Sequence, residues 1–164
     1  MEKFGLAVVC ISDRSAAGER EDASGSAISL ALEDMADTII YTIIPDETEK
    51  IKSALLNICL NPQVQVILTT GGTGCAPRDV TPEATLAVAD KLVPGIAEEI
   101  RRQSMVFTPN AMLSRAVSVI CGSTLIVNLP GSPKAVRECC EIIKPILPHA
   151  VKLLKNEVND CARK

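Results

Sequence analysis

Residues 4–11 read FGLAVVCI, and Ser12, Asp13 and Arg14 follow them directly. None of the eight carries a charged or hydroxyl side chain, so neither face of the stretch is polar enough to indicate exposure to solvent. A strand that is apolar on both faces is typical of a parallel sheet that helices cover on both sides. The stretch therefore predicts a buried strand of an α/β protein.

Strands and helices are predicted to alternate along the rest of the chain. Further strands are expected at Thr38–Ile44, Val64–Leu68, Val117–Cys121 and Thr124–Asn128. Apolar residues at helical spacing predict four helices: one carries Ile28, Ala31, Leu32 and Met35, a second Ile51, Ala54, Leu55, Ile58 and Cys59, a third Val136, Cys139, Cys140 and Ile143, and the last Leu147, Val151, Leu154 and Val158. Pro82 and Pro94 mark two more helix starts, because proline is favoured at the first helical position.

This alternation predicts a three-layer α/β/α sandwich with a mostly parallel sheet. Gly122 and Ser123 separate the last two strands, and a two-residue loop led by glycine predicts a type II′ hairpin. One pair of strands is therefore expected to be antiparallel. The chain shows no linker, repeat or low-complexity stretch, so residues 1–164 are expected to form a single domain.

The composition argues against several classes of partner. The 164 residues carry a formal net charge of −3, so nothing predicts the basic face that duplex nucleic acid requires. Aromatic residues are limited to Phe4, Tyr41 and Phe107, too few for a platform that stacks single-stranded bases. The first apolar run is far shorter than the ~20 residues of a membrane span, and no signal-peptide cleavage site follows it. We expect no nucleic-acid or membrane partner.

The cysteines indicate a reducing compartment. There are seven, an odd number, and none forms a C-x-x-C pair, which favours free thiols and a cytoplasmic location. Cys139 and Cys140 are adjacent, and neighbouring cysteines rarely form a disulfide because the geometry is strained. His149 is the only histidine, so a zinc site of the mixed histidine and cysteine kind lacks ligands.

Polar, glycine-rich segments follow the predicted strands where the strands end. They are Ser12–Arg14, Pro45–Glu47, Thr69–Gly74 and Asn128–Lys134. Because ligands of α/β sheets bind at the carboxyl ends of the strands, four such segments together predict a site.

The loop at residues 69–74, TTGGTG, suits an anion. Three glycines let backbone N–H groups approach a phosphate closely. The loop is not a Walker A loop, since no Gly-Lys-Ser/Thr closes it, and it lacks the spacing of the dinucleotide fingerprint. A tight turn between a strand and a helix is the alternative interpretation.

Cationic residues near these segments point to the same kind of ligand. Ser114 and Arg115 precede the hairpin and could present a hydroxyl and a fixed positive charge to a phosphate. Lys134 falls in the first turn of a helix that Ser132 is predicted to cap, where a positive charge is unfavourable. This indicates an anionic partner or, as the commoner explanation, an exposed surface lysine.

Two arginines are assigned away from the site. Arg101 and Arg102 are expected on a solvated helix face, paired with Glu98 and Glu99.

Two aspartates have both a structural and a functional interpretation. Asp46, three residues before Glu49, fits a capping box, and Asp79 could cap locally or pair with Arg78, although Thr81 is the better N-cap. Alternatively, the two carboxylates together hold Mg²⁺, which binds one or two carboxylates plus substrate phosphates. Residue type alone favours the structural interpretation of each.

The loop at 69–74 and the run PRDVTPEAT at 77–85 together resemble the signature of the molybdenum cofactor biosynthesis proteins of the MogA type. The G domain of gephyrin and its plant counterpart are the same module. The similarity extends over nearly the whole chain, through Ile11–Arg14, Ile44–Glu47, Met112–Arg115, Asn128–Ser132 and Leu147–Ala150. Cys75 is one departure, at a position that looks variable.

The resemblance implies a molybdopterin adenylyltransferase, which transfers AMP from ATP to molybdopterin with Mg²⁺ and releases pyrophosphate. It implies a cytoplasmic homotrimer that hands its product to a molybdate-inserting protein. It also implies that Asp46 and Asp79 are catalytic and bind the metal. The implied substrate-binding residues are Ser12, Asp13, Gly71, Gly72, Thr73, Gly74, Thr81, Ser114, Arg115, Asn128, Pro130, Gly131, Ser132 and Lys134.

Three alternatives stay open. The chain could be a carrier or trimeric scaffold that holds molybdopterin without catalysis, or a relative of the MoaB branch with uncertain activity. The Arg78–Glu83 run favours the MogA-type interpretation over the MoaB branch. A dehydrogenase or another nucleotide-binding α/β protein is disfavoured by the absence of the dinucleotide fingerprint.

Overall fold

The computed structural model describes residues 3–157. Within these residues, six strands form one sheet in the order β2-β1-β3-β6-β5-β4. The strands are β1 (Phe4–Ile11), β2 (Ala36–Ile44), β3 (Val66–Thr70), β4 (Lys91–Leu92), β5 (Ser118–Cys121) and β6 (Thr124–Leu129). β2, β1, β3 and β6 run parallel, and β5 is antiparallel to both of its neighbours.

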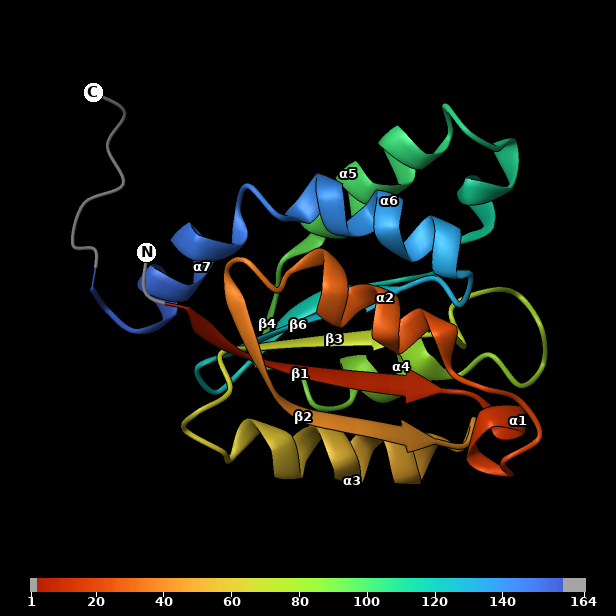
Figure 1. Ribbon diagram of the computed structural model, residues 1–164, viewed down its shortest axis with the longest axis horizontal. Coiled ribbons are helices and arrows are strands. Elements are labelled where there is room, and N and C mark those ends of the chain that lie inside the picture. Colours follow the sequence, from red (N-terminus) through yellow and green to blue (C-terminus); the bar gives the residue numbers. More distant parts are fainter. Residues whose placement is uncertain (1–2, 158–164) are drawn as a thin grey trace.

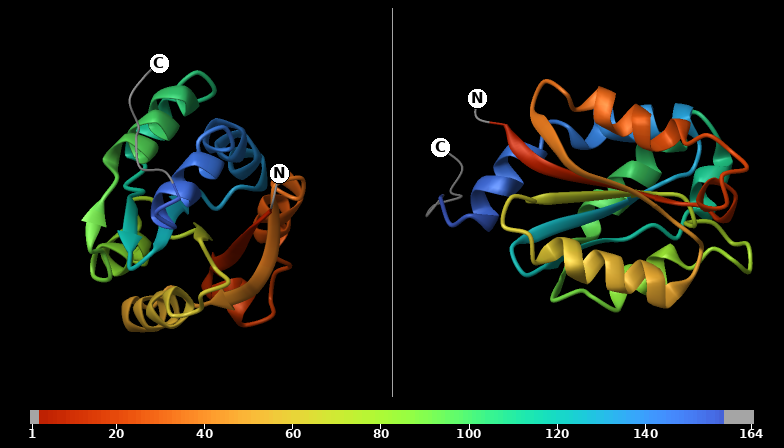
Figure 2. Two further views of the ribbon diagram at one scale, coloured as in Figure 1. Left: turned by 90° about the vertical axis from the view of Figure 1, so that its left-hand side faces the viewer. Right: turned by 60° about the horizontal axis from the view of Figure 1, so that its bottom comes forward.

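Helices cover both faces of the sheet, so the molecule has three layers (Figure 1). The upper layer in that view holds α2 (Ala23–Ala31), α5 (Pro94–Ser104), α6 (Pro133–Ile143) and α7 (Leu147–Leu154). The lower layer holds α3 (Thr48–Cys59) and α4 (Thr81–Leu86). A short helix, α1 (Asp13–Ala16), follows β1, and the 3₁₀ helix η1 (Pro109–Leu113) follows α5. Figure 2 shows the same layers from two other directions.

The alternation of side chains along β1 explains why both faces must be covered. Leu6 and Val8 point into the core under α2, α6 and α7, whereas Ala7 and Val9 point into the core over α3 and α4. All eight residues of β1 are buried. The apolar run at residues 4–11 is therefore a strand buried on both faces, as the sequence predicts.

The predicted fold class is confirmed, and so is the hairpin. β5 and β6 pair antiparallel across Gly122 and Ser123. Gly122 has a φ of 59° and Ser123 a negative φ, which is the combination that a type II′ turn requires. β4 is not predicted from the sequence, because two exposed residues give no periodic signal.

The helix predicted through Ile28 and Met35 is partly wrong. α2 ends at Ala31, and the chain turns through residues 32–35 before β2 begins. Leu32 and Met35 still pack against the upper core, because a tight turn can bury the same side chains as a helical face. In the last predicted helix, Val158 lies outside the described residues. No helix within residues 3–157 is long and apolar enough to span a membrane.

Candidate active site

The candidate site lies where β1, β2, β3 and β6 end at one edge of the sheet. Ile11 pairs with Ile44, and Thr70 pairs with both Cys10 and Leu129, so the four strand ends stand at one level. The segments that follow the strands therefore meet at the right-hand edge in Figure 1, as the sequence predicts.

The glycine-rich loop leaves β3 in a conformation that requires glycine. Gly71 has a φ of 98° and Gly72 a φ of 64°, and these left-handed values strain any residue with a side chain. A Cβ on Gly71 would collide with the carbonyl oxygen of Ile11, and one on Gly72 with the hydroxyl of Thr81. Thr81 also ties the loop down: its hydroxyl donates to the Gly71 carbonyl (2.9 Å) and its N–H to the Gly72 carbonyl (3.1 Å).

Three consecutive N–H groups of this loop, in the range 72–74, donate to no acceptor within residues 3–157. The N–H of Gly71 differs, since it donates to the Leu129 carbonyl (3.2 Å). The turn before α6 lies beside the loop: a Cβ on Gly131 would stand 3.5 Å from the Cα of Gly71. Open N–H groups and a helix N-terminus both favour an anion at this position.

Asp13 and Asp46 are joined by a reciprocal pair of hydrogen bonds. The Asp13 N–H donates to Asp46 Oδ2 (2.9 Å), and the Asp46 N–H donates to Asp13 Oδ1 (3.0 Å). Arg78 binds the same Asp13 carboxylate with Nε (2.9 Å) and Nη2 (2.8 Å), which lowers the pKa of Asp13. Asp13 therefore ties the ends of β1 and β2 to the loop that carries Asp79.

Asp46 and Asp79 both abut the glycine-rich loop. A Cβ on Gly72 would lie 3.0 Å from Asp46 Oδ1, and one on Gly74 would lie 2.8 Å from Asp79 Oδ2. Burial raises the pKa of Asp46, and the charges of Asp13 and Asp79 act in the same direction. A cation held between these carboxylates would relieve their mutual repulsion.

The carboxylates of Asp46 and Asp79 fit a magnesium ion whose remaining ligands are phosphate oxygens of the substrate. Asp46 Oδ2 accepts the Asp13 N–H, and Asp79 Oδ2 accepts the Ala76 N–H (2.9 Å), whereas neither Oδ1 accepts a hydrogen bond from residues 3–157. Over those same residues, no cluster of three or more His, Cys, Asp or Glu side chains could hold a metal. Mg²⁺ usually takes one or two carboxylates plus phosphates, so this pair suits it when a phosphate is bound.

The capping-box interpretation of Asp46 and Glu49 is wrong. Glu47 is the N-cap of α3 and makes no side-chain cap hydrogen bond. The Asp46 carboxylate is turned instead toward the N–H of Asp13 across the sheet edge. The hydrogen bonds between Asp46 and Asp13 at the strand ends take the place of a side-chain cap on α3.

The predicted N-cap at Thr81 is also wrong. α4 begins at Thr81 itself, with Val80 as its N-cap, and the Thr81 hydroxyl is used by the glycine-rich loop. Ser132, by contrast, caps α6 as predicted, with its Oγ accepting the N–H of Ala135.

Arg101 does not lie on a solvated face, so that prediction is wrong. Its Nη1 donates to the carbonyl oxygens of Ala116 (2.8 Å) and Ser114 (3.4 Å). No sequence pattern signals such a contact between a helix and the loop that precedes β5. Arg102 pairs with Glu99, as expected.

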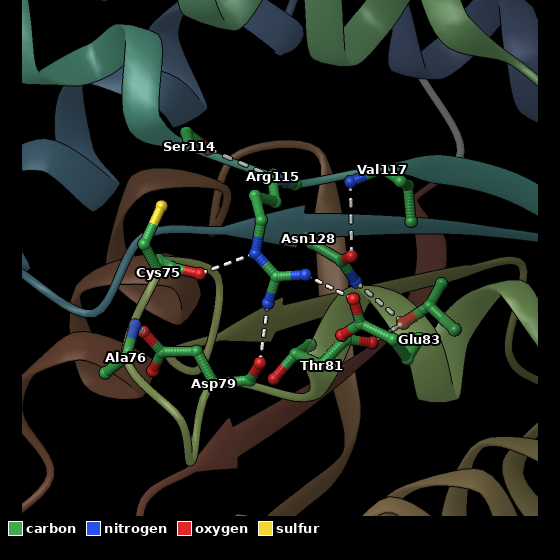
Figure 3. A network of polar contacts seen from close by, with 12 residues as sticks. Cys75, Ala76, Asp79, Thr81, Glu83, Ser114, Arg115, Val117 and Asn128 are labelled. Carbon is green, nitrogen blue, oxygen red and sulfur yellow. Dashed lines mark hydrogen bonds and ion pairs between the residues drawn. The ribbon is translucent and has the colours of Figure 1, made fainter.

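Asn128 is buried beneath the site, not on its surface (Figure 3). Its Oδ1 accepts the Val117 N–H (3.2 Å), and its amide donates to the hydroxyls of Thr69 (3.0 Å) and Thr85 (2.9 Å). The structure therefore places this residue in a cross-link between β6, β3 and α4. The guanidinium of Arg115 is likewise engaged by protein groups.

Two hollows among residues 3–157 border the glycine-rich loop, and a third lies beside Asp46. The most apolar, about 270 Å³, lies between α5, η1 and α6 and is lined in part by Thr73, Gly74, Ser114 and Pro130. A smaller, polar one of about 110 Å³ includes Ser12, Gly71 and Gly131. An open one of about 410 Å³ includes Asp46 and Arg78. Lys134 is exposed near the start of α6 and lines none of these three.

Asp22 and Ser24 belong to this edge, although they are absent from the predicted site residues. Asp22 caps α2, accepts the N–H groups of Ser24 and Gly25, and receives the hydroxyl of Tyr41. Ser24 donates to the Gly131 carbonyl (2.7 Å), which fixes the turn before α6. The signal available in the sequence was an aspartate at an N-cap position before a helix.

Residues 7–149 match the family model described as "Probable molybdopterin binding domain". The chain belongs to this family. Among curated members, the Helicobacter pylori protein named molybdopterin adenylyltransferase is 41% identical over 157 residues, which are 94% of this chain and 89% of that one. The Escherichia coli protein of the same name is 42% identical over 147 residues, 88% of this chain and 75% of that one.

Solved structures of the molybdopterin-binding family share the fold. The molybdopterin biosynthesis enzyme MoaB from Thermus thermophilus superposes with a TM-score of 0.88 at 44% identity, over 93% of this chain and 97% of that one.

Proposed function

We propose that this protein is a molybdopterin adenylyltransferase that uses ATP. The observation that carries the proposal is the row of open N–H groups at 72–74 with Asp46 and Asp79 against the same loop. Curated relatives of this name, at 41% and 42% identity, support it. We also propose that the whole chain acts as one domain in a reducing cytoplasm, which suits its six free thiols within residues 3–157.

Adenylyl transfer depends on positioning the two substrates and neutralising the charge of their phosphates more than on proton transfer. The terminal phosphate of molybdopterin is already anionic at neutral pH, so its oxygen can attack the α-phosphorus of ATP without a general base. The bond from that phosphorus to the bridging oxygen breaks, and pyrophosphate leaves with the electron pair. His149 is the only histidine, and it lies in α7, away from the glycine-rich loop.

The residues at the sheet edge would divide this work. The open N–H groups at 72–74 would hold a phosphate and stabilise the charge that develops on it. Asp46 and Asp79 would hold Mg²⁺ through their Oδ1 atoms. Bound there, the ion would supply positive charge to the α-phosphate and to the leaving pyrophosphate. Ser12, Pro130, Gly131, Ser132 and Lys134 stay proposed substrate contacts.

We further propose that the protein is a homotrimer, and the exposed edge of the sheet supports self-association. β2 is an edge strand of nine residues, and it exposes the apolar side chains of Ile39 (41% exposed), Tyr41 (42%) and Ile43 (38%). A long apolar edge strand pairs or aggregates unless something covers it. Hand-off of the product to a molybdate-inserting protein is part of the same proposal.

The decisive experiment is incubation of the purified protein with molybdopterin, ATP and Mg²⁺, followed by chromatography for adenylyl-molybdopterin. We expect product that depends on Mg²⁺. Asp46→Asn and Asp79→Asn should each reduce the rate by about 10²-fold or more, because each removes a charge that holds the ion. Molybdopterin binding should stay close to that of the wild type.

One outcome would replace the proposed activity, and another would change only the roles of the two aspartates. Tight molybdopterin binding without product would identify a carrier or scaffold. Wild-type rates in both aspartate variants would remove their catalytic role while leaving the activity in place.

A further inference from the structure

All three guanidinium nitrogens of Arg115 donate to protein groups (Figure 3). Nε donates to the Gly74 carbonyl (2.7 Å), Nη2 to the Asp79 carbonyl (2.6 Å), and Nη1 to the Glu83 carboxylate. Its backbone N–H also donates to the Thr73 carbonyl (2.9 Å). One residue therefore binds the glycine-rich loop, the loop that carries Asp79, and α4.

The backbone around Arg115 is itself held from the opposite side. Arg101, on α5, donates to the carbonyl oxygens of Ser114 and Ala116, the two neighbours of Arg115 in the chain. The Ala116 N–H is within reach of Ser114 Oγ (3.4 Å). The Arg115 side chain thus projects from a fixed backbone, and its planar fork loses little freedom when it binds.

A phosphate held by the fork of Arg115 would compete with these contacts, because only the second N–H on each Nη is left without an acceptor within residues 3–157. The ion pair with Glu83 also raises the pKa of Arg115 and lowers that of Glu83, so both stay charged. Turning Arg115 toward a substrate would leave Glu83 unpaired and would release the Gly74 and Asp79 carbonyls. The open N–H groups at 72–74 offer an anion site without these losses.

We propose that Arg115 is a positioning residue, not a phosphate ligand: it fixes Gly74 and Asp79 relative to each other. This inference rests on the proposed function, because Asp79 is there a metal ligand. Its carbonyl is held by Arg115 and its Oδ2 by the Ala76 N–H, so the free Oδ1 has one direction in which to point. A displacement of about 1 Å at a reacting centre can cost about 10²-fold in rate.

The test compares the wild type with Arg115→Lys and Glu83→Gln. Lysine keeps the charge but cannot reach two carbonyls and a carboxylate at once. The substitution Glu83→Gln keeps the shape of the partner side chain and removes its charge, without touching substrate. Arg102→Lys is the matched control, because Arg102 makes a similar fork with Glu99 on an exposed face of α5.

Two quantities are measured on the full chain. The first is amide hydrogen exchange over residues 75–80, read at the hydrogen-bonded N–H groups of Ala76 and Asp79. The second is kcat and KM for ATP in adenylyl transfer. We expect Arg115→Lys to speed exchange in this segment about tenfold, with exchange in β3 unchanged. We expect kcat to fall about 10²-fold with KM changed less than about threefold. Glu83→Gln should follow in the same direction with smaller effects, and Arg102→Lys should match the wild type.

A different division of the effect between kcat, KM and hydrogen exchange would overturn the inference. If KM for ATP rises about tenfold in Arg115→Lys while kcat and exchange stay at wild-type values, Arg115 binds phosphate directly. Unchanged exchange and unchanged kinetics would also overturn it. If the wild type shows no transfer at all, the proposed function fails, and the exchange data alone still decide whether Arg115 orders the loop.

Discussion

Asp22 and Tyr41 show how one side chain sets the ionisation of another at the edge of this site. The Tyr41 hydroxyl donates to Asp22 Oδ2. Burial, together with this hydrogen bond to an anion, raises the pKa of Tyr41 to about 12. Burial opposes ionisation of Asp22, yet hydrogen bonds from Gly25 and Tyr41 outweigh it and lower the pKa of that carboxyl.

A spectroscopic titration tests this pair. The chain has one tyrosine and no tryptophan, so the near-ultraviolet absorbance of tyrosinate reports Tyr41 alone. We expect a midpoint near pH 12 in the folded protein, and Asp22→Asn should move it down toward the ordinary value of about 10. A wild-type midpoint at 10, with circular dichroism still native, would contradict the pairing.

The same shift predicts how stability depends on pH. The folded pKa of Tyr41 lies above its unfolded value, so the contribution is fully present below about pH 10. It is lost as the pH rises through about 12. Chemical unfolding of the wild type and Asp22→Asn across this range should show the two stabilities converging at the alkaline end.

Among the secondary-structure elements, the sequence was sufficient wherever a local pattern decides the outcome. The uniform apolar run predicted β1, and glycine before Ser123 predicted the hairpin. Prediction failed where a side chain forms hydrogen bonds with residues distant in the sequence. Asp46 bonds to Asp13, and Arg101 bonds to two backbone carbonyls. Such contacts follow from the spatial order of strands, which no local pattern records.

We expect the substitution of glycine by alanine to change the free energy of unfolding in opposite directions at two positions. Gly72→Ala should destabilise the protein by about 1–2 kcal/mol or more, because its φ of 64° is unfavourable for alanine and the Cβ would collide with Thr81. Gly95→Ala, in α5, meets no atom within 4 Å and should stabilise by about 0.5–1 kcal/mol. Denaturant unfolding measures both, and a stable Gly72→Ala protein would mean that the loop is not locked.

At the scale of the whole molecule, the exposed apolar residues of β2 decide the prediction about assembly. We expect the double substitution Ile39→Lys and Ile43→Lys to convert the proposed trimer to monomers, because it places charges on the apolar edge. Both residues are exposed, so the fold should persist. Sedimentation gives the mass, with Leu60→Lys as a control at an exposed apolar residue after α3. A trimer that survives the double substitution would place the contact elsewhere.

The position of β6 has a consequence for synthesis of the chain. β6 is the last strand of residues 3–157 to be made, yet it lies between β3 and β5 inside the sheet, and all its residues are buried. A nascent chain that ends before residue 124 leaves β3 with an open, apolar edge and no Asn128 cross-link beneath the glycine-rich loop. Such a chain is exposed to aggregation and has no site. The glycine-rich loop therefore gains its support only after the ribosome has made β6, so the protein can act only after that point.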